Sequence, residues 1–140
     1  MDQIIIFIKT QLKRDRTIPL IGAGIILMVI AFFMGISDNI PGIVVAFAGM
    51  TLIVFAFLHH WREARLFGTL FAVSVISFPV LVLLHNIFDG INQNIGTIPI
   101  LNQLLSGLAV MSFLGAIFLA PAGILIGLIA GLFYLVKSKS

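Results

Sequence analysis

Residues 108–136 read LAVMSFLGAIFLAPAGILIGLIAGLFYLV, an unbroken run of 29 uncharged residues. A helix rises about 1.5 Å per residue, so ~20 apolar residues cross a hydrocarbon core of ~30 Å. This run therefore predicts a membrane-spanning helix that is long enough to tilt, bend or protrude. Pro121 lies inside the run, and an alternative interpretation divides it there into two crossings.

Three further uncharged runs precede it and predict spans over residues 18–36, 41–58 and 66–84. Together the four runs predict one membrane domain over residues 1–140. The predicted fold class is an all-α integral membrane protein, a four-span transmembrane helical bundle.

The segment between the last two spans, residues 86–107, is uncharged apart from Asp89. It contains turn signals at Asp89–Gly90 and at 94–96, and apolar residues recur at helical spacing after Pro99. We expect this segment to lie along the outer membrane surface and to bend into the last span.

The composition agrees with a membrane protein. The chain is 61% hydrophobic and 9% charged, with a mean hydropathy of +1.23, which lies outside the range of soluble globular domains. It has no cysteine, which excludes disulfides, thiolate metal sites and thiol redox catalysis.

The basic residues form three short clusters separated by the apolar runs. We expect them to contact lipids of the inner leaflet: Lys9, Lys13, Arg14, Arg16, Arg62, Arg65, Lys137 and Lys139. An excess of Lys and Arg marks cytoplasmic segments, so both termini are predicted to be cytoplasmic, in a multi-pass protein of a bacterial or archaeal plasma membrane. No cleaved signal peptide is predicted. The net charge of +3 belongs to these clusters, and no nucleic-acid partner is expected.

Residues 1–17 are predicted to form a short amphipathic helix, because Ile4, Ile5, Ile8 and Leu12 share one face. Such a helix either rests in the headgroup region or simply leads into the first span.

Small residues recur every three or four positions along the last span, as in a glycine zipper. The stripe comprises Ser112, Ala116, Ala120, Gly123, Gly127 and Gly131. Helices in lipid associate by close backbone approach, which small side chains permit. The stripe therefore predicts either packing against the other spans of the chain or the seam of a homo-oligomer.

Pro79 lies in the middle of the third predicted span and follows Ser74 and Ser77. A transmembrane proline leaves the carbonyl one turn earlier without its helical donor, and hydroxyl groups or water can satisfy it. These three residues therefore predict a static kink or, alternatively, a hinge or polar lining.

The three histidines are candidate haem or metal ligands. His59 and His60 lie at the predicted inner boundary and His85 at the outer one, about 30 Å away, so they cannot share one iron within a monomer. No cofactor, metal site or catalytic residue is predicted. No acidic, basic or amide side chain lies near the middle of a span, which argues against a proton-coupled antiporter. Small multidrug exporters, for example, depend on a glutamate in their first helix, and the first predicted span has none.

These observations predict a non-enzymatic integral membrane protein that acts through helix–helix packing. It would be a homo-oligomer or an accessory subunit of a membrane complex, in contact with lipids and with itself or other membrane subunits. The alternative is a small channel, a holin-like pore or a facilitator for an uncharged solute. A redox subunit that uses the histidines is a weaker third hypothesis.

Overall fold

The computed structural model describes residues 10, 15–35, 39–95 and 99–138. Nearly all of the predicted amphipathic helix, including Lys9, Lys13 and Arg14, lies outside the described residues, as does Lys139. The described chain is helical, with no strand in those ranges. Its elements are α2 Thr17–Met34, α3 Ile40–Leu58, α4 Ala64–Ile95, α5 Pro99–Leu114, the π-helical turn η1 Gly115–Leu119 and α6 Ala120–Lys137.

Four stretches of helix are long and apolar enough to cross a membrane. They are α2, α3, α4 up to Asn94, and the continuous stretch Pro99–Lys137 formed by α5, η1 and α6. The all-helical fold with four such helices is the one that the uncharged runs predict.

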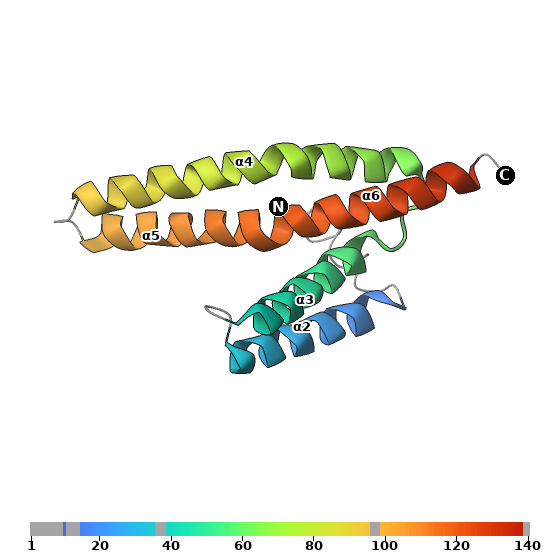
Figure 1. The fold of residues 1–140 in the computed structure, drawn as a ribbon, viewed down its shortest axis with the longest axis horizontal. Helices are drawn as coiled ribbons and strands as arrows, with labels where there is room; N and C mark the ends of the chain where they lie inside the picture. Colours follow the sequence, from blue (N-terminus) through green and yellow to red (C-terminus); the bar gives the residue numbers. More distant parts are fainter. Residues whose placement is uncertain (1–9, 11–14, 36–38, 96–98, 139–140) are drawn as a thin grey trace.

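The elements form two antiparallel hairpins, α2–α3 and α4 with α5–α6 (Figure 1). Figure 1 shows the shorter hairpin inclined to the longer one. The two hairpins meet where α3 contacts η1 and α6. We call the end of the bundle that holds Arg16, Arg62, Arg65 and Lys137 the basic end, and the opposite end, where α4 ends and α5 begins, the far end.

The shorter hairpin is held by close backbone contact. A Cβ atom added at Gly24 would lie 2.8 Å from the carbonyl oxygen of Gly49, and one added at Gly49 would lie 2.8 Å from that of Gly24. At the basic end, the buried Thr17 hydroxyl donates a hydrogen bond of 3.3 Å to the Ala56 carbonyl. The first two helices therefore associate through small residues, as expected for helices in lipid.

The far end differs from the prediction. The turn expected at Asp89–Gly90 is wrong, because both residues lie inside α4, which continues to Ile95. The helix start expected near Pro99 is confirmed. Segment 86–107 thus forms the end of a helical hairpin in which Asn92 donates a 2.9 Å hydrogen bond to Ser106. Contacts between the helices outweigh the local turn preference.

The last helix runs without interruption through Pro121, so the alternative of two separate crossings is wrong. The turn just before it is wider than an α-helix, since the Ala120 amide donates to the Gly115 carbonyl five residues back. Pro121 has no amide hydrogen, and the wide turn ends two residues before it, at Leu119. In this turn Ala116 and Phe118 are both buried, and Phe118 packs with Ala31 and Ala46 of the shorter hairpin.

Candidate functional site

The glycines of the small-residue stripe, Gly123, Gly127 and Gly131, face α4 of the same chain. Ser112, Ala116, Ala120, Gly123 and Gly127 are buried, and Gly131 is half-buried. A Cβ atom added at Gly127 would lie 2.7 Å from the Phe71 amide nitrogen and 2.9 Å from the Phe67 carbonyl oxygen. The glycines thus allow the backbones of α4 and α6 to come into direct contact, and this part of the stripe is covered within one chain.

The three residues predicted as a hinge or polar lining differ in burial. Ser74 is buried, with its hydroxyl against Gly123, whereas Ser77 is half-buried and Pro79 is exposed. Ser74 therefore takes part in the packing between α4 and α6.

His85 also joins two helices. Its Nδ1 atom lies 3.0 Å from the Ala109 carbonyl oxygen of α5, and its ring lies 5.1 Å from that of Phe113. His59 and His60 lie at the basic end, where α3 ends. Among the described residues, no group of three His, Asp or Glu side chains could hold a metal ion.

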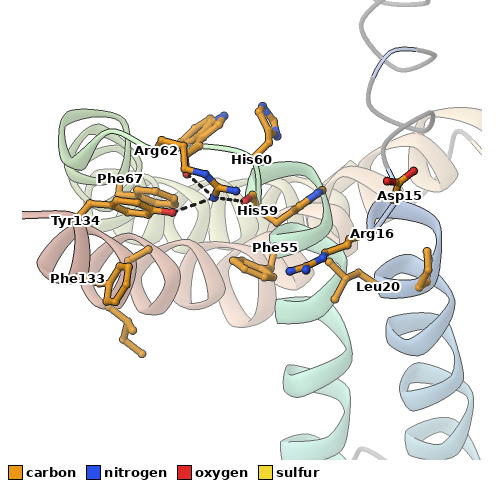
Figure 2. Close-up of a pocket in the computed structure, with 14 residues that line it drawn as sticks. Asp15, Arg16, Leu20, Phe55, His59, His60, Arg62, Phe67, Phe133 and Tyr134 are labelled. Carbon is orange, nitrogen blue, oxygen red and sulfur yellow. Dashed lines mark hydrogen bonds between the residues drawn. The ribbon is translucent and has the colours of Figure 1, made fainter. Parts of the chain in front are cut away.

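The most distinctive site is a cavity of about 950 Å³ at the basic end, which we call the basic-end cavity. It lies between the two hairpins, where α2 begins, α3 ends and the last turns of α6 pass (Figure 2). Its lining includes Arg16, Leu20, Phe55, Arg62 and Phe133. Because these residues are far apart in the sequence, only the arrangement of the hairpins brings them together.

Arg62 ties the connection between α3 and α4 to α6. Its Nη1 atom donates hydrogen bonds of 2.9 Å to the Tyr134 hydroxyl, 2.9 Å to the His59 carbonyl and 3.4 Å to the Trp61 carbonyl. Figure 2 shows these bonds converging on one side of the guanidinium group. The charge of Arg62 is thus held at the wall of the cavity.

Aromatic rings form the wall beside Arg62. The Phe67 side chain is almost completely buried, and its ring is stacked on that of Tyr134 at 5.6 Å with an interplanar angle of 2°. The Trp61 ring also packs against Phe67, with the two ring centroids 5.5 Å apart. The sequence predicts that Trp61 and Tyr134 lie at one membrane boundary, and the structure brings both rings into contact with Phe67 at the basic end.

Arg16 differs from Arg62 because its side chain makes no hydrogen bond or ion pair with any residue that the structure describes; only its carbonyl accepts one, from the Leu20 amide. It extends from the beginning of α2 toward Phe55 and His59 (Figure 2). Arg65 and Lys137, predicted to contact the same leaflet, are exposed at the basic end but do not line the cavity. The sequence thus identifies the cationic residues of this end but does not distinguish the two that face the cavity.

Sequence reasoning also missed the apolar part of the cavity, Phe55 and Phe133. Both side chains belong to predicted spans and look like ordinary lipid-facing residues in the sequence. A comparison of this chain with protein families, curated proteins and solved structures finds no match.

Proposed function

We propose that this chain is a non-enzymatic integral membrane protein with four crossings and cytoplasmic termini, and that it acts through contacts with other membrane helices. It would do so as a homo-oligomer or as an accessory subunit of a membrane complex. Its basic end would face the cytoplasm, in keeping with the distribution of Lys and Arg.

The exposed surface supports a lipid environment. Phe32 and Phe33 of α2 are 75% and 83% exposed, and large apolar side chains are exposed on every helix. Soluble monomers rarely expose contiguous apolar patches of more than a few hundred Å². Lipid tails, or the helices of another protein, would cover these side chains.

The observation that carries the proposal is a pair of exposed apolar stripes on the longer hairpin. Their members are three or four residues apart, so each stripe follows one face of its helix. The α4 stripe comprises Ile76, Val80, Leu83, Ile87 and Ile91, and the α5 stripe comprises Ile100, Leu104, Leu108 and Met111.

The helices that carry these stripes are longer than the membrane core is thick. Helix α4 has 32 residues and Pro99–Lys137 has 39, which correspond to about 48 Å and about 58 Å of helix. Even at a tilt of about 40°, these lengths project to about 37 Å and about 45 Å, more than the ~30 Å core. With the basic end at one boundary, the far end extends into the headgroup layer or beyond it.

Side chains such as Ile100, which is 81% exposed, would then lie beyond the reach of lipid tails. Contact with another protein would bury such a surface. Since Gly123 and Gly127 of α6 already contact α4, we place the contact with other subunits on the α4 and α5 stripes and not on the glycines.

The test is the mass of the intact assembly after purification in mild detergent. We expect a mass above that of the 15.2 kDa monomer, due to further copies or to a stoichiometric partner. Leu104→Asn should release that association, whereas Gln103→Asn, one position away on the exposed surface, should retain it. A monomeric mass for the unaltered chain, with no partner, would contradict the proposal.

A cysteine introduced on the same stripe separates the two forms of association. The chain has no cysteine, so Leu104→Cys provides a single thiol. Oxidation should join two copies in a homo-oligomer, and a thiol-reactive crosslinker should join the chain to a different protein in a complex. The pore or facilitator stays a prediction, and the packing of Ser74 against Gly123 leaves it without a structural observation in its favour.

A further inference from the structure

The lining of the basic-end cavity is of two chemical kinds. Guanidinium, imidazole and hydroxyl groups, among them those of Arg16, Arg62 and Tyr134, are polar, whereas aliphatic and phenyl side chains from α2, α3 and α6 are apolar. A phospholipid molecule combines a polar headgroup and apolar chains in the same way. We propose that the basic-end cavity binds an anionic phospholipid, with the phosphate between Arg16 and Arg62. This site is independent of the contact between subunits proposed above.

The charge of the cavity suits a phosphate. Arg16 and Arg62 contribute two positive charges to the lining and Asp15 contributes one negative charge. The Arg16 side chain has no partner among the described residues. Arg62 makes its three hydrogen bonds through Nη1 alone, so its other N–H groups can donate to a ligand. Guanidinium groups bind phosphate oxygens well, because their donors form a planar fork.

The apolar part suits an acyl chain. Phe55 is 36% exposed, while Ile129 and Phe133 are 59% and 61% exposed, so this wall can be reached from outside the bundle. All three line the cavity together with Leu20. A lipid chain against these side chains would continue along the surfaces of α3 and α6, which face hydrocarbon in the proposed orientation.

The size and position favour a lipid over a small soluble anion. At about 950 Å³ the cavity is at the upper end of the range for ligand sites, far more than one phosphate fills. It lies at the basic end, which holds Arg16, Arg62, Arg65 and Lys137. Basic pockets between transmembrane helices on the cytoplasmic side are typical sites for anionic headgroups. A soluble phosphate ester shares the headgroup chemistry but would leave the apolar wall uncovered.

The fluorescence of a tryptophan in the protein can report binding at this site. Trp61 lines the cavity and is the only tryptophan. Full-length protein in detergent would be saturated with phosphatidylglycerol whose acyl chains carry bromine, which quenches nearby indole fluorescence. Unbrominated lipids are then added, and the concentration that restores the Trp61 fluorescence is measured.

We expect phosphatidylglycerol to displace the brominated lipid at a concentration about fivefold lower than phosphatidylcholine, since one net positive charge is worth about 1 kcal/mol at a membrane surface. Arg16→Gln should remove this preference. Arg65→Gln, a neutralisation at the same end but outside the cavity, should change it by less than about twofold. Because the Arg16 side chain has no partner among the described residues, the Arg16→Gln protein should retain the thermal unfolding midpoint of the unaltered protein.

Three results would overturn the proposal. One is equal displacement by phosphatidylglycerol and phosphatidylcholine. Another is an equal effect of Arg16→Gln and Arg65→Gln, which would indicate general attraction to the basic end. The third is displacement by soluble glycerol phosphate at the concentrations that suffice for phosphatidylglycerol, which would show that the acyl chain contributes nothing.

Discussion

Gly127 of α6 lies directly against the backbone of Phe71 in α4, with no room for even one added carbon between them. Gly127→Ala should therefore push the two helices apart, because neither backbone can yield locally. Overpacking of this kind costs about 1–3 kcal/mol. We expect the free energy of unfolding, measured by titration with a denaturing detergent, to fall by that amount.

Gly131 supplies the matched control, one helical turn further along the same face. A Cβ atom there would lie 3.5 Å from the Phe67 Cβ, an ordinary van der Waals distance. Gly131→Ala should leave the free energy of unfolding unchanged or raise it slightly. Equal losses for both variants would mean that close approach of α4 and α6 at Gly127 is not what stabilises this hairpin.

The shorter hairpin offers a second, independent pair of variants. A Cβ atom at Gly49 would lie 2.8 Å from the Gly24 carbonyl oxygen, whereas one at Gly22 would meet no atom within 4 Å. Gly49→Ala should lower the free energy of unfolding by about 1–3 kcal/mol. Gly22→Ala should raise it by up to about 1 kcal/mol, since alanine is the better helix former. A smaller loss for Gly49→Ala than for Gly22→Ala would contradict the packing of α2 on α3.

Tyr134→Phe tests the hydrogen bond to Arg62 without removing the ring that stacks on Phe67. We expect the free energy of unfolding to fall by about 1 kcal/mol, the usual net value of one hydrogen bond. In Arg62→Gln the same hydroxyl has already lost its donor. Adding Tyr134→Phe to that variant should therefore lower the free energy of unfolding by much less than about 1 kcal/mol. A loss as large as in the unaltered protein would show that the two side chains do not interact.

The topology can be examined with single cysteines, because the chain has none of its own. Glu63 and Ser138 are exposed at the basic end and Gln103 is exposed at the far end. In intact cells, a membrane-impermeant thiol reagent should label Gln103→Cys, and it should label Glu63→Cys and Ser138→Cys only after the membrane is opened. Labelling of Gln103→Cys and Ser138→Cys from the same side would refute the four crossings.

Much of the helical framework can be predicted from the sequence. Uncharged runs must be helical in lipid, because no water is present to satisfy the backbone. The first two helices accordingly end within two residues of the predicted spans 18–36 and 41–58. The small-residue stripe is equally visible in the sequence, but its partner is not, since small residues pack in the same way on the chain's own helices and on another copy.

The rest depends on contacts between distant segments. Asp89–Gly90 has the composition of a turn and lies in a helix, because α4 packs along α5 and side chains such as Gln93, which donates to Asp89, bond within the helix. The basic-end cavity arises from the inclination of one hairpin to the other. No local pattern in residues 16–20 or 129–134 indicates that they face a common space.

The π-helical turn at 115–119 inserts one residue beyond the regular α-helical repeat, which corresponds to about 100° of rotation about the helix axis. The residues of α5 and of α6 that face α4 therefore do not follow one regular α-helical repeat, because the turn between the two helices shifts it by one residue. Deletion of one residue from this turn would restore a regular helix, and it would rotate either Ala109 or Gly123 out of contact with α4. Natural variation in length should therefore be rarer in these five residues than in the connections between the helices.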